Sequence, residues 1–217
     1  FFSDSQPSDS AMSYAGPKWY VNDTTTGGDS YTAVTGSDTS GDGSITKPYR
    51  TINKVLGRLG FGAGDTIYID SGLYSETLTI NYDNVWIEGV DSGATVLSLT
   101  TADSNSAVNV GIFADTQVGL IIRKLGMKFM YRGMDFYNVD NARIDSVTVE
   151  LSGNHGIVLE VNADTNVLSG NRVLNSGVSG FYLTGAAGNT LTNNSASNNI
   201  GEGFDFWTNS HANQITS

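Results

Sequence analysis

The sequence contains no cysteine, which excludes disulfide bonds, thiolate nucleophiles and cysteine-based zinc sites. It is also poor in positive charge, because 11 basic side chains stand against 22 acidic ones and the formal net charge is −11. Such an acidic chain is a poor partner for nucleic acid, since phosphate binding needs clustered Lys and Arg. No stretch approaches the roughly 18 consecutive apolar residues of a membrane helix, so we expect no insertion into a membrane.

The residues that are abundant favour strands and turns over helices. The 217 residues include 26 Gly and 20 Asn, together with many Ser and Thr, while hydrophobic residues make up 39% and charged residues 15%. Asn, Ser and Thr compete with the helical backbone for hydrogen bonds, and Gly suits tight turns. The composition therefore predicts a folded, all-β chain that is long enough for a domain with a sizeable core.

The first 64 residues differ from the rest and are expected to form an arm and a cap. Residues 1–16 are rich in Ser and show no sustained period, which indicates an arm or linker. Residues 17–64 are expected to form an N-terminal cap with a short strand, a loop rich in Gly and Asp, and one helix. Apolar residues at helical spacing predict that helix over 51–59, with Thr51 as N-cap and Gly60 as its end. It would cover the edge of the first coil.

Two carboxylates in the cap loop, Asp38 and Asp42, are candidate calcium ligands. Both lie close to glycines, and Ca²⁺ is bound by several oxygen atoms from flexible loops. The spacing differs from that of an EF-hand, and an ordinary turn accounts for the same residues. Calcium binding is therefore one of two interpretations of this loop.

Residues 65–217 contain a repeat of 22–24 residues. A glycine followed by a strand with apolar residues on either side of a variable one recurs at Gly111, Gly133, Gly156, Gly180 and Gly203. Two further apolar columns keep the same period, namely Leu120, Ile144, Leu168, Leu191 and Ile215, and Leu125, Val149, Val173 and Ala196. Three columns with one period predict a parallel solenoid of about six or seven coils, with apolar side chains inward and the intervening ones outward. A corner ladder of stacked amides is expected for Asn171 and Asn194.

These repeats resemble the right-handed parallel β-helix proteins of the pectate-lyase-like superfamily, over about residues 17–217. The coil sequence GIVLEVNADTNVLSGNRVLNSGVSGFYLTGAAGNTLTNN is similar to the repeat of carbohydrate-binding and sugar-processing members. The opening WYVNDTTTGGDSYTAVTGSD is similar to N-terminal regions of large secreted or surface proteins of bacteria that use type IX secretion. The resemblance implies a right-handed solenoid in a secreted or cell-surface protein. It fixes no activity, because this fold hosts several functions.

The resemblance also implies that sugars bind on the outward face of one sheet. The outward positions after each repeated glycine combine carboxylates, which accept hydrogen bonds from hydroxyl groups, with aromatic rings, which stack on sugar rings. The candidate glycan-binding residues are Asp115, Asp135, Tyr137, Glu160, Tyr182, Asp205 and Trp207. Outward strand positions favour Tyr and Trp in any sheet, so an ordinary surface is the competing interpretation.

No catalytic set of the related enzymes is complete in this sequence, so no catalytic residue is assigned. Glycoside hydrolysis needs two carboxylates, and Asp135 with Glu160 is the one pair that the columns bring close. Asn154-His155-Gly156 is similar to a polygalacturonase motif whose companion elements are absent, and neither Arg132 nor Arg143 falls on an outward position. An acidic groove also repels polyuronate unless Ca²⁺ bridges the charges.

We therefore expect an extracellular β-helix segment of a larger secreted or cell-surface protein, with a structural or adhesive role and glycan binding as an option. The alternative is a polysaccharide lyase or C5-epimerase whose catalytic residues lie partly beyond residue 217. Residues 215–217 stand in the middle of a coil. The rest of a larger chain, or another protein, is expected to cover that edge.

Overall fold

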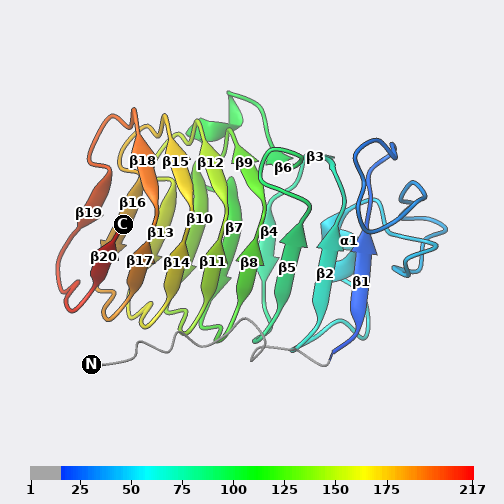
Figure 1. Cartoon of the computed structure of the whole chain (residues 1–217), viewed down its shortest axis with the longest axis horizontal. Helices are drawn as coiled ribbons and strands as arrows, with labels where there is room; N and C mark the ends of the chain where they lie inside the picture. Colours follow the sequence, from blue (N-terminus) through cyan, green and yellow to red (C-terminus); the bar gives the residue numbers. More distant parts are fainter. Residues whose placement is uncertain (1–15) are drawn as a thin grey trace.

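The structure is a computed structural model that describes residues 16–217, and in this part the chain winds into stacked coils (Figure 1). Each complete coil contributes one strand to each of three sheets, so the solenoid has three sides. The predicted all-β, right-handed parallel β-helix with coils of 22–24 residues is confirmed. The arm predicted over residues 1–16 lies outside the described residues, except for its last residue.

All strand pairs within the three sheets are parallel. Sheet 1 contains, in spatial order, β1 (Lys18–Val21), β2 (Thr66–Ile69), β5 (Trp86–Gly89), β8 (Ile121–Arg123), β11 (Arg143–Asp145), β14 (Val167–Ser169), β17 (Thr190–Thr192) and β20 (Gln214–Thr216). Sheet 2 contains β3 (Gly72–Tyr74), β6 (Thr95–Ser98), β9 (Gly126–Lys128), β12 (Thr148–Glu150), β15 (Arg172–Leu174) and β18 (Ser195–Ser197). Sheet 3 contains β4 (Leu78–Ile80), β7 (Val110–Asp115), β10 (Arg132–Tyr137), β13 (Ile157–Glu160), β16 (Phe181–Thr184) and β19 (Phe204–Phe206).

The apolar column that follows the repeated glycines lines the core side of sheet 3, as predicted. Its members are neighbours in register on five successive strands, namely Ile112, Met134, Ile157, Phe181 and Phe204. The first four are fully buried, and the rings of Phe181 and Phe204 stack with their centroids 4.7 Å apart. Stacking of equivalent side chains in this way buries one continuous core along the axis of the solenoid.

The other two predicted columns are out of register in one coil. The second column contains Ile122 rather than Leu120, and the third contains Met127 rather than Leu125. This coil advances by only 22 residues between Ile122 and its partner Ile144. The four side chains concerned are all buried and apolar. Hydropathy therefore cannot tell which residue of each pair lies in the strand and which lies at the corner beside it.

The repeated glycines mark a close approach between two walls of the solenoid. A Cβ atom at Gly156 would lie 2.2 Å from Cγ1 of Val173, which projects from sheet 2. It would also lie 2.7 Å from the carbonyl oxygen of Gly180 in the next coil. A larger residue would push the backbone apart, which explains why a glycine recurs at this position in five successive coils.

Buried asparagines form the ladder predicted for Asn171 and Asn194, together with a second ladder. In the first, the backbone N–H of Asn171 donates to Oδ1 of Asn194 at 2.9 Å. In the second, Oδ1 of Asn189 accepts the backbone N–H of Asn166 at 2.8 Å, and the backbone N–H of Asn189 donates to Oδ1 of Asn213 at 2.8 Å. The side chains thereby satisfy backbone groups at the corners, where the strand hydrogen bonds are interrupted.

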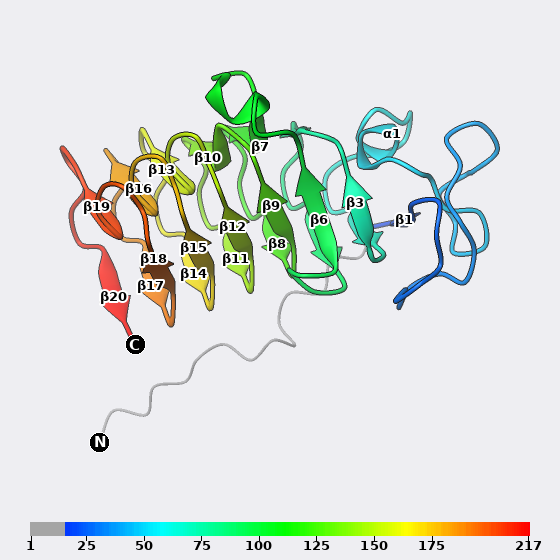
Figure 2. The same ribbon diagram turned by 90° about the horizontal axis from the view of Figure 1, so that it is seen from above.

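The cap contains the helix α1 (Ile52–Leu56), which is shorter than predicted. It ends at Gly57 rather than Gly60, and Leu59, which helical spacing predicts on the apolar stripe, is 99% exposed. α1 contacts β1, β2 and β4. A short 3₁₀ helix, η2 (Asp103–Asn105), lies in the loop that projects between β6 and β7 (Figure 2). Among the described residues, no helix is long and apolar enough to cross a membrane.

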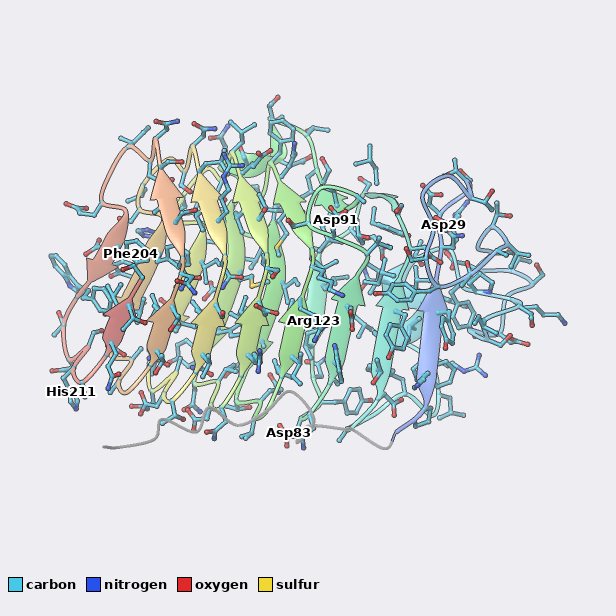
Figure 3. The ribbon with its side chains drawn as sticks, in the orientation of Figure 1. Asp29, Asp83, Asp91, Arg123, Phe204 and His211 are labelled. Carbon is cyan, nitrogen blue, oxygen red and sulfur yellow. The ribbon has the colours of Figure 1, made fainter. Side chains whose placement is uncertain are left out.

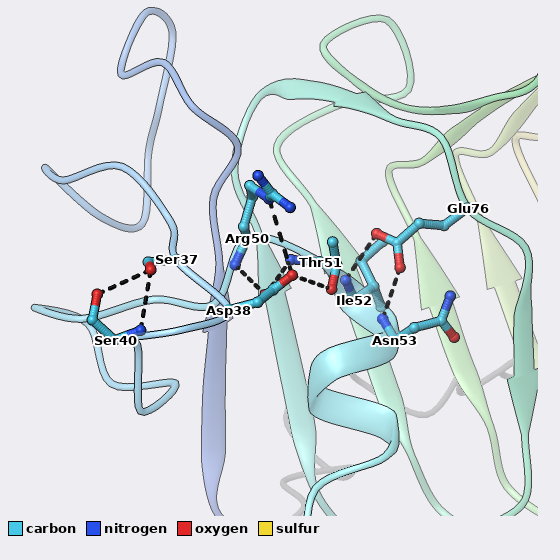
Figure 4. Close-up of polar contacts among 8 residues, drawn as sticks. All are labelled: Ser37, Asp38, Ser40, Arg50, Thr51, Ile52, Asn53 and Glu76. Atoms are coloured by element: carbon cyan, nitrogen blue, oxygen red, sulfur yellow. Dashed lines mark hydrogen bonds and ion pairs between the residues drawn. The ribbon is translucent and has the colours of Figure 1, made fainter.

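A carboxylate from the first coil caps α1 (Figure 4). Thr51 is the N-cap residue, as predicted, but its side chain makes no capping hydrogen bond. Instead, the carboxylate of Glu76 accepts the backbone N–H groups of Ile52 and Asn53, both at 2.9 Å. The carboxylate accepts hydrogen bonds from backbone N–H groups that have no partner within the helix. Its negative charge also interacts favourably with the positive end of the helix dipole. Glu76 therefore joins the cap to the first coil.

Candidate functional site

The outward face of sheet 3, uppermost in Figure 2, carries the candidate glycan-binding residues. Two rows of side chains run across its strands, along the axis of the solenoid. The first row contains Phe113, Asp135, Val158, Tyr182 and Asp205. The second contains Asp115, Tyr137, Glu160 and Thr184. Six of the seven candidates therefore lie in register on one sheet, and Trp207 follows directly after β19.

Exposure divides the candidates into an accessible set and one buried residue. Trp207 exposes 63% of its surface and Tyr137 exposes 39%. The other accessible or half-buried candidates are Asp115, Glu160, Tyr182 and Asp205. Asp135 is only 6% exposed, so it does not present its carboxylate to solvent as its outward position predicts. Its neighbour in register, Val158, is fully buried although it also holds an outward position.

Asp135 is paired with Arg132. Arg132 Nη1 lies 2.6 Å from Asp135 Oδ2 and 3.2 Å from Glu160 Oε1, so one guanidinium joins carboxylates from adjacent strands. Alternation along a strand predicts Arg132 and Asp135 on opposite faces. The expectation that Arg132 is not on the outward face is therefore wrong, since its long side chain follows the two charges rather than the alternation.

The surroundings of Asp135 shift its pKa. Burial is the largest influence and raises the pKa above its ordinary value of 3.8, whereas Arg132 lowers it and Glu160 raises it. The net direction is upward, because desolvation disfavours the charged form. Asp135 Oδ1 and Arg132 Nε are both buried, and neither has a hydrogen-bond partner within the described part of the chain. A cluster with these properties is also typical of functional sites.

A second cluster on the same face surrounds Tyr182. The imidazole of His155 stacks on the Tyr182 ring, with centroids 4.3 Å apart and planes at 14°. The backbone N–H of Ser179 donates to His155 Nδ1 at 3.2 Å, and the hydroxyl of Ser179 donates to Asp205 Oδ2 at 3.2 Å. Ser179 thus holds the imidazole and the carboxylate around Tyr182.

The environment of His155 lowers its pKa. Burial is the main cause and the charge of Arg132 adds to it, while Asp205 and Glu160 oppose the shift. The neutral imidazole accepts a hydrogen bond at Nδ1, so its own proton is on Nε2. His155 is therefore a hydrogen-bond donor through Nε2 and not a cation that compensates the nearby carboxylates.

Three of these residues were not among the candidates, and they share one position in the repeat. Arg132, His155 and Ser179 each immediately precede a repeated glycine. The same position contains Glu202 in the last coil. The repeat could have revealed this third row, but alternation alone assigns it to the core side. Residues at this position instead reach outward around the close-packed glycine.

The two calcium candidates in the cap serve different turns, and Figure 4 shows the contacts of Asp38. Asp38 accepts the backbone N–H groups of Arg50 and Thr51 at 2.9 and 3.0 Å, and the Thr51 hydroxyl at 2.9 Å. Asp42 accepts the backbone N–H of Ser44 at 2.9 Å, and hydrogen bonding to Ser44 lowers the pKa of Asp42. Across residues 16–217, no group of three or more His, Asp or Glu side chains gathers to hold a metal. The turn interpretation accounts for both carboxylates.

Imidazole and thioether side chains, which bind soft and borderline metals, are also dispersed. Met127, Met130 and Met134 are fully buried in the core. His155 precedes β13, whereas His211 lies in an exposed turn beyond β19, at the far end of the sheet-3 strands (Figure 3). Between residues 16 and 217 there is thus no accessible set of such ligands.

The chain is similar in fold to solved structures of a pectate lyase, a rhamnogalacturonan lyase and an alpha-1,3-glucanase. The chain aligns over 90% of its length with pectate lyase Pel9A (TM-score 0.66, 14% identity) and over 93% with a rhamnogalacturonan lyase (0.55, 15%). It aligns over 59% with the catalytic domain of a GH87 alpha-1,3-glucanase in complex with tetrasaccharides (0.52, 23%). The chain spans 52%, 62% and 24% of those proteins, respectively. At these identities the likeness shows the fold alone.

A family model described as periplasmic copper-binding protein (NosD) matches residues 62–217, which include every complete coil. No curated protein matches the sequence. The residues of the described part do not fit a copper ion, because the three methionines are inside the core and the two histidines lie apart. The match covers well over half of the chain, and the chain therefore belongs to the NosD family of right-handed parallel β-helices.

Proposed function

We propose that this chain is the β-helix segment of a larger secreted or cell-surface protein, and that it binds a polysaccharide on the outward face of sheet 3 without cleaving it. The observation that carries the proposal is that Tyr137 and Tyr182 lie in register with carboxylates on one face, and that the exposed Trp207 follows directly after the last strand of that sheet. Its role would be structural or adhesive. A periplasmic or extracellular location agrees with the description of the family.

The chemistry of the face supports a sugar polymer as the ligand. Aromatic rings offer apolar faces to sugar rings, and ionised carboxylates accept hydrogen bonds from hydroxyl groups. Successive strands lie about 4.8 Å apart, so equivalent contacts recur at short intervals along the axis. A linear polysaccharide can use such repeated contacts in a way that a single sugar cannot.

Binding without turnover is favoured by the position of Asp135. Glycoside hydrolysis requires two carboxyl groups that reach the scissile bond from opposite sides. Asp135 is buried and paired with Arg132, which also contacts Glu160. Neither carboxylate of this pair is free to act as a nucleophile or a base while the guanidinium joins them.

A polysaccharide-binding screen with variants of the exposed rings tests the proposal. Trp207→Ala and Tyr137→Ala should each weaken binding of the best ligand by about tenfold, since loss of one stacking contact costs about 1–1.5 kcal/mol. Tyr82→Ala is the matched control, because Tyr82 is 41% exposed but lies in the corner loop between β4 and β5. Unchanged affinity in both site variants, or equal losses in all three, would overturn the assignment of this face.

A second candidate function, a polysaccharide lyase or C5-epimerase, is favoured by one observation. Asp135 combines a raised pKa with a neighbouring cation and a second carboxylate, as catalytic acids often do. Incubation with polyuronates, followed by absorbance of unsaturated products and by analysis of C5 configuration, separates the two functions. If the wild-type protein forms product and Asp135→Asn does not, the function of this face is catalysis rather than binding.

A further inference from the structure

We infer that the sugar bound on this face carries a positive charge, as in a polysaccharide with free amino groups, and that Asp205 and Tyr182 bind its ammonium group. The inference rests on the proposed function, because it names the ligand class of the same face. It depends on three features of sheet 3: the balance of charge, the surroundings of Asp205, and the stacking of Tyr182.

The carboxylates of the face outnumber its cations. Arg132 is the one Lys or Arg in the three outward rows, and it is already engaged by two carboxylates. The acidic members of these rows are Asp115, Asp135, Glu160, Glu202 and Asp205. No Lys or Arg follows Arg172 in the sequence, so the last coils add only negative charge. Such a face attracts cations and repels uronates.

Asp205 is the half-buried carboxylate of this face that lacks a charged partner. It accepts one hydrogen bond, from the hydroxyl of Ser179 at 3.2 Å. Within residues 16–217 no Lys or Arg forms an ion pair with it, whereas Asp135 and Glu160 both reach Arg132. A carboxylate offers about four acceptor sites, and an ammonium group brings three donors and the missing charge.

The ring of Tyr182 adds a second attraction for a cation at the same place. Tyr182 and Asp205 are direct neighbours in register on β16 and β19. His155 belongs to the coil before Tyr182 and stacks on its ring, while Asp205 belongs to the coil after it. The imidazole therefore covers one face of the Tyr182 ring, and Asp205 lies beside Tyr182 on the next strand. A cation beside Asp205 can also contact the π face of the ring.

Asp135 lies on the same row but is not part of the ammonium site. It is more than nine-tenths buried, and its Oδ2 lies 2.6 Å from Arg132 Nη1, so its carboxylate is not open to a polymer on this face. The cation site therefore depends on Tyr182 and Asp205, which are direct neighbours on β16 and β19.

Calorimetric titration of the full chain with two oligosaccharides tests the inference. The hexamer of glucosamine, with free amines, and the hexamer of N-acetylglucosamine have the same backbone but differ in charge. We expect the amine form to bind about tenfold more tightly at low ionic strength, from one ion pair assisted by the aromatic ring. The difference should shrink in about 0.5 M NaCl, because salt screens the ion pair.

Two variants assign the effect to Asp205. Asp205→Asn keeps the size of the side chain and an acceptor for Ser179 but removes the charge, so the preference for the amine form should disappear. Asp145→Asn makes the same change of net charge on β11 of sheet 1 and should keep the preference. A preference that survives in Asp205→Asn would overturn the assignment of this residue.

The remaining outcomes separate this inference from the proposed function. Equal binding of both hexamers would overturn the charge selectivity and leave polysaccharide binding standing. If hexalysine binds as tightly as the glucosamine hexamer, the face recognises a basic peptide and the sugar assignment is overturned. If neither hexamer binds, the inference is overturned, and the polysaccharide screen described above still decides the proposed function.

Discussion

At the residue scale, the charges on sheet 3 depend on Arg132, which compensates two carboxylates. Its guanidinium contacts Asp135 and Glu160, and Asp135 is the more buried of the two. Removing one partner of a buried ion pair leaves a desolvated charge, which costs more than the pair itself contributes. The energetic consequences of this site should therefore appear when Arg132 is removed rather than when Asp135 is neutralised.

Arg132→Ala should lower the free energy of unfolding by about 3 kcal/mol, since it strands the carboxylate of Asp135 without a partner. Urea denaturation followed by circular dichroism measures the change. Arg172→Ala is the control, because Arg172 is exposed on β15 and its removal should cost less than about 0.5 kcal/mol. Equal losses in the two variants would contradict the role given to Arg132.

The raised pKa of Asp135 predicts how stability depends on pH. The folded state holds this proton more tightly than the unfolded state, so stability from the group is present at low pH and is lost as the pH rises from the ordinary value of 3.8 through the raised pKa. The difference in unfolding free energy between wild type and Asp135→Asn should therefore fall across this interval. A difference that stays flat or rises would contradict the direction of the shift.

At the element scale, the corners of the coils determine whether the strands can stack. Corners interrupt the strand hydrogen bonds, and one corner column contains left-handed residues of four types, namely Asn141, Thr165, Gly188 and Ala212. The buried asparagines beside them supply the missing donors and acceptors. Asn189 both accepts from Asn166 and donates through Nδ2 to the carbonyl of Ala163, at 2.8 and 3.0 Å.

Asn189→Ala should destabilise the fold by about 2–4 kcal/mol, because it leaves a buried N–H and a buried carbonyl without partners. Asn189→Asp, which keeps the acceptor but loses the donor, is expected to fall between this variant and wild type in the same urea titration. Asn81→Ala removes an exposed amide and should have little effect. A loss in Asn189→Ala no larger than that control would show that water replaces the ladder.

At the scale of the whole molecule, the solenoid is held together by contacts between neighbouring coils. Each strand pairs only with the equivalent strands of the coils before and after it. The last coil has one such neighbour in the described structure, and Ile215, although in the second apolar column, is 52% exposed. The same substitution should therefore have different consequences in the middle and in the last coil.

Leu159→Asp should abolish stable folding or cost more than about 4 kcal/mol, because it places an unpaired carboxylate in the core between β10 and β16. Ile215→Asp makes an apolar-to-charged change in the same repeat and should cost less than about 1 kcal/mol, since water reaches that position. Thermal denaturation compares the two. Similar melting temperatures would contradict the inward assignment of Leu159.

Much of the fold was predictable because a solenoid repeats its core. Residues that follow Gly156 and Gly180 face the same environment in every coil, so their period identifies strands, sheet and register together. The prediction fails where a coil changes length, since Leu120 and Ile122 are equally apolar and equally buried. It fails again in the cap, where Glu76 rather than the side chain of Thr51 caps the helix, because that contact joins distant parts of the chain.

The sequence by itself determined the all-β class, the parallel solenoid and the face on which the candidate residues gather, because each follows from local alternation and a regular period. Only the tertiary structure decided which of those residues are accessible. Asp135 is outward yet buried beneath Arg132, and His155 and Ser179 join the site from the position before a glycine. The positions of long, flexible side chains depend on the charges and the free space that neighbouring coils provide. The spacing of residues along the sequence contains no information about these contacts.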